Sequence, residues 1–137
     1  MSEQENTKVV QRGYESFKSG DIQGLLDLFS EDIQWHLPKM ENVPFAGKRQ
    51  GREQVKQFFA SLADAQEVKQ FELREVIAQG DKVVALGHYI WRVKSTGREF
   101  AADWAHVWTV RDGKLTRLHE YTDTAAAVSA YQKAQSA

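Results

Sequence analysis

A histidine and a carboxylate occur on neighbouring predicted strands in the segment 100–123, FAADWAHVWTVRDGKLTRLHEYTD. His106 stands between Trp104 and Trp108 with the same parity, and Glu120 lies on the following strand. An imidazole titrates near neutral pH and burial raises the pKa of a carboxyl group towards that range, so such a pair in an apolar setting suits proton transfer. The pattern indicates either a plain core or the wall of a small-molecule pocket.

The same segment predicts the β-hairpin that would position both groups. Alternate residues from Phe100 to Val110 share one face of a strand, and His106 is among them. Asp112-Gly113 favours a tight turn, because the central residues of that turn need positive φ. His106 and Glu120 are therefore expected on adjacent antiparallel strands.

Helical patterns fill the first half of the chain. Ser2-x-x-Glu5 fits a capping box before a helix that ends at Gly20, and Asp21 can cap a second, short helix. The elements expected next are a strand at 33–37, a loop at 38–51 and a third helix from about Arg52.

Four strands are predicted in the second half, over residues 67–79, 82–94, 99–111 and 114–121. Connections this short favour an antiparallel meander. Helices followed by a meander predict an α+β fold with the helices packed on one face of a curved sheet. One domain over 1–137 is expected. Its end segments, 1–6 and 125–137, are expected to be frayed, with a short helix as the alternative for the Ala-rich second segment.

The composition argues against several classes of function. The 137 residues suit one domain, 42% of them are hydrophobic and the formal net charge is −1, so nothing favours binding to nucleic acid or an anionic membrane. Cysteine is absent, which excludes disulfides, thiolate metal ligands and a cysteine nucleophile. The polar N-terminus lacks a signal-peptide core and no apolar run approaches the ~20 residues of a membrane span, so a soluble cytoplasmic protein is expected.

Several short motifs are spread over residues 7 to 124. They are Tyr14-x-x-Phe17-x-x-Gly20-Asp21, Phe29-Ser30-Glu31-Asp32-Ile33-x-Trp35, Phe45-Ala46-Gly47 followed by Gly51, His106-Val107-Trp108-x-Val110-x-Asp112-Gly113-Lys114 and Glu120-Tyr121-x-Asp123. This pattern resembles the nuclear transport factor two-like superfamily, and within it the SnoaL-like and ketosteroid-isomerase-related proteins. The resemblance implies a cystatin-like cone, in which a curved antiparallel β-sheet wraps around three N-terminal helices and encloses one apolar cavity. It also implies a homodimer through the outer face of the sheet.

The resemblance transfers only part of the known chemistry. The carboxylate base of the ketosteroid isomerases corresponds to Leu37, and their tyrosine and aspartate oxyanion hole corresponds to Tyr14 and His106. The water-positioning pair of the limonene epoxide hydrolases corresponds to Trp35 and Leu37, and their Arg-x-Asp to His88-x-Ile90. Their last-strand acid is retained as Glu120. The base of the SnoaL-like cyclases corresponds to either Glu120 or Asp123.

The cone geometry implied by the resemblance directs His88, His106 and Glu120 into one cavity. The predicted catalytic residues are His106, Glu120 and Tyr14, with Glu120 as the base and His106 or Tyr14 as donors to a developing enolate. The predicted pocket residues are Phe17, Trp35, Leu37, Phe58, Phe59, His88, Trp104, Trp108 and Leu118.

Purely structural roles remain open for each of these side chains. His106 can be a core histidine bonded to a backbone carbonyl or to Glu120, and Glu120 can be a buried partner of His88 or Arg92. Tyr14 can be a plain helix–sheet contact, and the aromatic residues can be core. Asp123 can cap the C-terminal segment.

No metal and no cofactor are expected. His36 and His119 have the opposite parity to the candidate pocket residues of their strands, and no HxH or HExxH spacing occurs. Neither G-x-G-x-x-G nor a P-loop is present, which argues against a nucleotide cofactor. The basic stretch 45–52 is expected to form a loop over the cavity mouth, with side chains that are solvated or attract an acidic group on a ligand.

Three functions compete at this point. The first is a cofactor-independent isomerase, cyclase or lyase that acts on a small hydrophobic carbonyl compound. The second is a non-catalytic binder with the same pocket. The third is a protein-interaction module in which Tyr89 and Trp91, predicted on the outer face with Gly87, form a partner patch or a homodimer seam.

Overall fold

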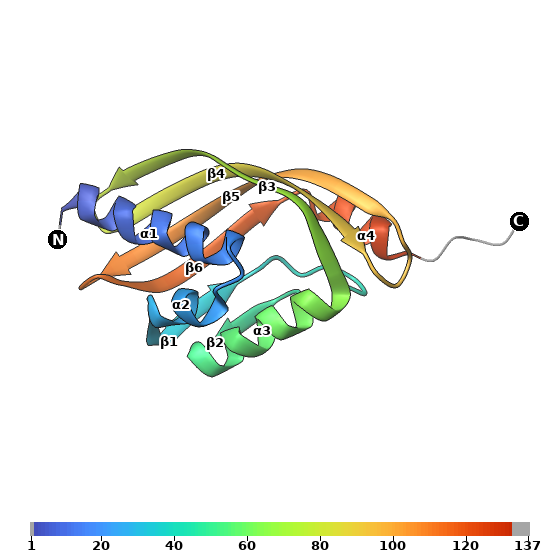
Figure 1. The fold of residues 1–137 in the computed structure, drawn as a ribbon, viewed down its shortest axis with the longest axis horizontal. Coiled ribbons are helices and arrows are strands. Elements are labelled where there is room, and N and C mark those ends of the chain that lie inside the picture. Colours follow the sequence, from blue (N-terminus) through green and yellow to red (C-terminus); the bar gives the residue numbers. More distant parts are fainter. Residues whose placement is uncertain (1, 133–137) are drawn as a thin grey trace, which may run out of the picture.

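The computed structural model describes residues 2–132, and its six strands form one curled, unclosed sheet (Figure 1). Helices α1, α2 and α3 lie along one side of the sheet, and α4 lies at the end near the C-terminus (Figure 1). The elements are α1 (Glu3–Lys18), α2 (Ile22–Asp27), β1 (Phe29–His36), β2 (Lys48–Gln50), α3 (Arg52–Ala65), β3 (Gln66–Gln79), β4 (Lys82–Val93), β5 (Glu99–Arg111), β6 (Lys114–Thr122) and α4 (Thr124–Tyr131). Over the described residues, no helix combines the length and the apolar character of a membrane span.

The strand order is β2-β1-β6-β5-β4-β3. Strands β3 to β6 pair antiparallel, and Asp112 (φ 51°) and Gly113 (φ 76°) form the turn between β5 and β6. The predicted α+β fold, with a curved sheet over N-terminal helices, is confirmed. Two pairings were not predicted: β1 runs parallel to β6, and β2 forms within the expected 38–51 loop.

Side-chain caps fix where the helices begin. Ser2 and Asp21 accept hydrogen bonds from backbone N–H groups three residues on, at 3.1 and 2.9 Å, so both predicted caps are confirmed. Asp123 caps α4 in the same way at 3.0 Å. The two end segments are therefore helical beyond these caps, while residue 1 and residues 133–137 lie outside the described residues.

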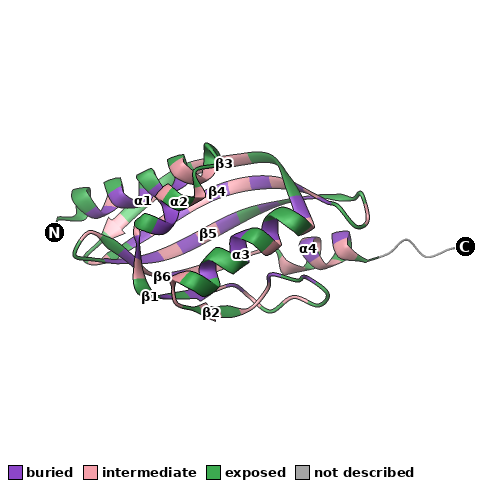
Figure 2. Cartoon of the chain, turned by 60° about the horizontal axis from the view of Figure 1, so that its bottom comes forward, coloured by how far each residue is buried: buried purple, intermediate pink, exposed green. Residues whose placement is uncertain are grey.

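The prediction for the two faces of β4 is wrong. Tyr89 and Trp91, expected on the outer face, are buried on the inner face. Every second residue of β4 is buried, which gives this strand its alternating colours in Figure 2. His88 has the opposite parity and pairs with Asp103, which is exposed on the outer face. Alternation along a strand defines two faces without indicating which of them is buried.

Gly87 allows the sheet to bury Trp104. The two residues pair across β4 and β5, and a Cβ at Gly87 would collide with the Trp104 ring and with the backbone oxygen of Glu72. The missing side chain leaves room for the indole ring against the strand. This close approach explains a glycine in the middle of a strand, where its low strand propensity would otherwise disfavour it.

Gly87→Ala should therefore destabilise the protein by about 1–3 kcal/mol, because a buried ring or the backbone must move to admit the methyl group. Urea unfolding followed by circular dichroism measures the change. Gly13→Ala is the matched control, since its new Cβ would lie 3.4 Å from Leu25, an ordinary contact, and alanine favours helix α1. Equal stability of the two variants would contradict this role of Gly87.

Candidate functional site

Four side chains form a series of hydrogen bonds in the interior. The Tyr14 hydroxyl lies 2.6 Å from Nδ1 of His106, and Nε2 of His106 lies 2.7 Å from Oε2 of Glu120. The indole N–H of Trp108 donates to the Tyr14 oxygen at 2.9 Å. These four residues are called the polar chain below.

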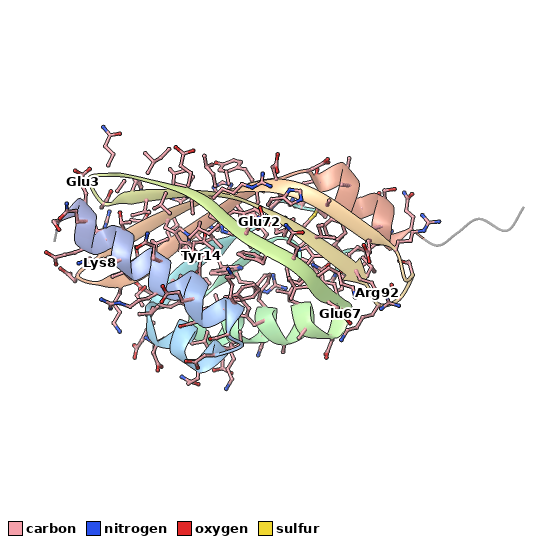
Figure 3. The ribbon with its side chains drawn as sticks, turned by 45° about the horizontal axis from the view of Figure 1, so that its top comes forward. Glu3, Lys8, Tyr14, Glu67, Glu72 and Arg92 are labelled. Carbon is pink, nitrogen blue, oxygen red and sulfur yellow. The ribbon has the colours of Figure 1, made fainter. Side chains whose placement is uncertain are left out.

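The register of the sheet and the buried face of α1 bring the polar chain together. His106 pairs with Glu120 across β5 and β6, and Trp108 lies two residues further along β5 on the same face. Tyr14 is buried on the side of α1 that packs on the sheet, as Figure 3 shows. The structure thus joins the three side chains that the sequence analysis proposed as catalytic.

The hydrogen bonds are all satisfied when His106 is neutral and Glu120 is ionised. Tyr14 O–H then donates to Nδ1, and Nε2–H donates to the carboxylate. Burial raises the pKa of Tyr14 well above its ordinary value, and the Glu120 charge raises it further. The hydrogen bond from Trp108 lowers the pKa but offsets only part of this increase. Tyr14 therefore keeps its proton and is a hydrogen-bond donor instead of a base.

The polar chain borders a cavity of about 90 Å³ whose remaining wall is almost entirely apolar. The expected pocket residues that line it are Phe17, Trp35, Leu37, Phe58, Phe59, Trp108 and Leu118. The wall also includes side chains that the sequence analysis did not predict, among them Met40, Phe45, Tyr89, Trp91 and Phe100.

Four of the missed wall residues lie in two parts of the chain. Tyr89 and Trp91 lie on β4, whose inner and outer faces the sequence analysis exchanged. Met40 and Phe45 come from the segment between β1 and β2, which has no regular period that could indicate their direction. The signal for the inner face of β4 was Gly87, which pairs with the buried Trp104 and leaves room for its ring.

Two expected pocket residues lie elsewhere. His88 is on the outer face, where Nδ1 lies 2.8 Å from Oδ1 of Asp103, so its placement in the cavity is wrong. Trp104 is buried but lies outside the cavity wall and stacks on His106, with ring centroids 4.2 Å apart. Trp104 therefore supports the polar chain instead of facing a ligand.

The structure also decides between alternatives for the acids. The partner of Glu120 is His106, not His88 or Arg92. Asp123 accepts a hydrogen bond from the backbone of α4, so it serves as the predicted cap. Glu120 is thus the acid that borders the cavity.

The arginines of the basic stretch 45–52 have structural partners. Arg49 donates to the backbone oxygen of Phe45 at 2.7 Å and lies over the Phe58 ring, 5.3 Å from its centroid. Arg52 donates to a backbone oxygen of β1 at 2.6 Å. Within the described part of the chain, no cluster of three or more His, Cys, Asp or Glu residues is arranged to hold a metal ion.

Both the sequence and the fold are similar to those of known proteins. The sequence model of the SnoaL-like domain family matches residues 10–118. A search of curated proteins gives no match. Among solved structures, an NTF2-like protein from Burkholderia xenovorans LB400 is 36% identical at a TM-score of 0.87, over 96% of this chain and 99% of that one.

Two further structures are similar over most of their length. TerC, co-crystallised with polyporic acid, is 30% identical at a TM-score of 0.82, over 93% of this chain and 98% of that one. A protein provisionally named as a SnoaL-like polyketide cyclase, from Mesorhizobium loti, is 21% identical at a TM-score of 0.71, over 83% of this chain and 96% of that one. The second likeness shows the fold alone.

The raised pKa of Tyr14 predicts a pH dependence of stability. The folded protein keeps this proton at pH values where the unfolded chain, with a tyrosine pKa of 10.0, loses it. The contribution is therefore complete below about pH 10 and is lost as the pH rises from there towards the higher folded-state pKa. Tyr14→Phe should flatten the decline of the unfolding free energy between about pH 9.5 and 11.5, measured by urea unfolding.

The slope, not the absolute stability, is the readout of this experiment, because Tyr14→Phe also leaves Nε1 of Trp108 and Nδ1 of His106 without a partner. Tyr121→Phe, at an exposed tyrosine, is the control and should keep the wild-type slope. Parallel curves for the wild type and Tyr14→Phe would contradict the prediction.

Proposed function

The chain belongs to the SnoaL-like domain family, and on this basis we propose that it is a cofactor-independent isomerase, cyclase or lyase that moves a proton on a small hydrophobic carbonyl compound. The observation that carries the proposal is the polar chain of Tyr14, His106 and Glu120 on the wall of an otherwise apolar cavity. A water-poor pocket with a few convergent polar groups is the usual form of a small-molecule site.

Glu120 is the general base in this proposal. Its carboxylate takes a proton from the carbon next to the carbonyl group, and the electron pair moves onto the carbonyl oxygen to form an enolate. In an isomerisation the proton returns at another carbon. In a cyclisation the enolate carbon attacks a second carbonyl carbon, whose π electrons move onto its oxygen, and that oxygen takes the proton from Glu120. His106, bonded to Glu120 at 2.7 Å, holds the carboxylate in position, and the carboxyl group of Glu120 itself gives the proton back.

Tyr14 supplies the hydrogen bond that the enolate oxygen needs. Its raised pKa keeps the hydroxyl protonated, and Trp108 fixes the oxygen by donating to it. The hydroxyl can turn from His106 to a ligand oxygen, which would stabilise the negative charge as it develops. The family resemblance places Leu37 at the position of the ketosteroid-isomerase base, so the proposal assigns the carboxylate chemistry to Glu120, which borders the cavity.

The size of the cavity sets a condition on binding. Its volume of about 90 Å³ is below the roughly 150 Å³ of a cavity that accommodates benzene. A larger ligand must therefore move the aromatic side chains of the wall. TerC, at 30% identity, was co-crystallised with polyporic acid, which supports a small organic molecule as the ligand of this fold in a related chain.

A second candidate function is non-catalytic binding of the same class of compound. The observation in its favour is that Tyr14, His106 and Glu120 satisfy one another by hydrogen bonds without any ligand. In that case the polar network has a structural role alone, which is to hold α1 against the sheet. The experiment below separates the two functions.

Proton transfer is tested in two steps. Ketones, lactones and steroids are first screened for thermal stabilisation of the protein. Ketones that bind are then incubated in D₂O, and exchange of their α-protons is followed by NMR. Glu120→Gln and His106→Phe should leave binding intact and reduce exchange by roughly 10²–10⁴-fold.

Glu75→Gln on β3 is the control, because this glutamate is exposed and outside the cavity. Binding without any catalysed exchange in the wild type would favour the non-catalytic function. A screen in which no compound stabilises the protein would remove the support for both functions.

We also propose that two copies associate through the outer face of the sheet. Val84, Leu86, Ile90 and Val107 are half-buried apolar residues on this face of β4 and β5. Their removal from water in a dimer would be favourable.

Sedimentation velocity over a range of concentrations measures the oligomeric state. Val107→Glu should convert a dimer into a monomer, because it places a charge in the middle of the proposed contact. Lys56→Glu, at an exposed position of α3, should leave the association unchanged. A wild type that stays monomeric at high concentration would contradict the proposal.

A further inference from the structure

One residue of the cavity wall carries a hydrogen-bond donor that has no protein partner. The Trp35 side chain on β1 is 5% exposed, and its Nε1 is fully enclosed without an acceptor. The other enclosed polar side-chain atoms without a partner among residues 2–132 belong to Asn6, Ser30, Arg52 and Trp104, none of which lines the cavity. Trp35 is therefore the described residue in which an unsatisfied donor and the cavity wall coincide.

The Trp35 ring is surrounded by aromatic rings, and its Nε1 makes no hydrogen bond to the protein. Its ring packs against the aromatic rings of Phe29, Phe58, Phe59 and Trp108, with centroids 5.3 to 5.9 Å away. Buried indole N–H groups usually find a hydrogen-bond partner, so this exception calls for an explanation.

Trp35 stands next to the polar chain. It pairs with Leu118 across β1 and β6, and Trp108 pairs with the same Leu118 from β5. The rings of Trp35 and Trp108 meet edge to face at 5.9 Å, and Trp108 donates to Tyr14. A compound that contacts Tyr14 in the cavity would therefore extend over or beside the Trp35 ring.

We propose that the indole N–H of Trp35 is a ligand-binding donor, and that it selects compounds with a second oxygen acceptor besides the carbonyl group at Tyr14. The inference rests on the proposed binding function and narrows its ligand class to dioxygenated apolar compounds. The wall side chains must move to admit a bicyclic ligand, because the cavity is only about 90 Å³. Because the indole nitrogen is itself enclosed, the same movement must also expose it to the ligand oxygen.

A matched pair of ligands tests this selection. 4-Hydroxy-1-tetralone and 1-tetralone differ by one hydroxyl group, and their dissociation constants are measured by calorimetry on the wild type and on Trp35→Phe. The substitution should weaken the hydroxyketone by roughly 5- to 100-fold more than the ketone, since only the hydroxyketone loses a hydrogen bond to a buried donor. Loss of ring area affects both ligands alike and cancels in the ratio.

Trp91→Phe is the matched control, because Trp91 also lines the cavity but its nitrogen is not among the enclosed atoms without a partner. It should leave the ratio of the two affinities unchanged. Circular dichroism verifies that each variant is folded. An equal loss of both ligands in Trp35→Phe would overturn the inference while the proposed binding function stands.

A measurement on the wild type avoids the risk that Trp35→Phe fails to fold. The chain has four tryptophans, so ¹⁵N-labelled protein gives four indole N–H signals. The Trp35 signal, assigned by selective labelling or by its loss in Trp35→Phe, should move downfield with 4-hydroxy-1-tetralone and much less with 1-tetralone. An unmoved signal at saturation, or no binding of either compound, would overturn the inference, whereas the proposed function fails only if no compound of the screen binds.

Discussion

The hydrogen bonds from Trp108 through Tyr14 and His106 to Glu120 constrain the whole arrangement. Polar groups in an apolar interior are costly unless each finds its partner, so these four side chains can be buried only in one relative position. That position fixes α1 against β5 and fixes the register of β5 with β6. The same contacts that hold the fold together therefore also place an acid, an imidazole and a phenol on one cavity wall.

The residues around this network show what the sequence could predict. The turn at Asp112-Gly113 predicted that His106 and Glu120 lie on adjacent antiparallel strands. The turn alone would set His106 opposite His119, and a register shift between Thr109 and Val110, which the sequence analysis did not predict, brings Glu120 opposite His106. Tyr14 was placed by the family resemblance, since no local pattern relates a helix in the first half of the chain to a strand in the second half. Caps at Ser2 and Asp21 were predictable because they involve backbone groups only three residues away.

The errors concern properties that depend on packing over long distances. His88 and Tyr89 alternate along β4 in a pattern that fits either face of a sheet, and only the contact between Gly87 and Trp104 on the neighbouring strand selects the face. The parallel pairing of β1 with β6 joins strands about eighty residues apart and has no signature within either strand. The volume of the cavity likewise depends on how far aromatic rings intrude, which residue types alone do not determine.

The polar chain and Trp35 raise opposite questions about binding. The polar chain is complete without a ligand, so a substrate can use Tyr14 only by competing with His106 for the hydroxyl proton. Trp35 has nothing to give up, because its N–H is bonded to no protein atom. A ligand oxygen therefore gains more binding free energy at Trp35 than at Tyr14. The hydrogen bond at Trp35 is new, whereas the hydrogen bond at Tyr14 replaces the existing one to His106. Binding energy collected at Trp35 can thus offset the cost of opening the polar chain, which is how a remote contact contributes to the reacting centre.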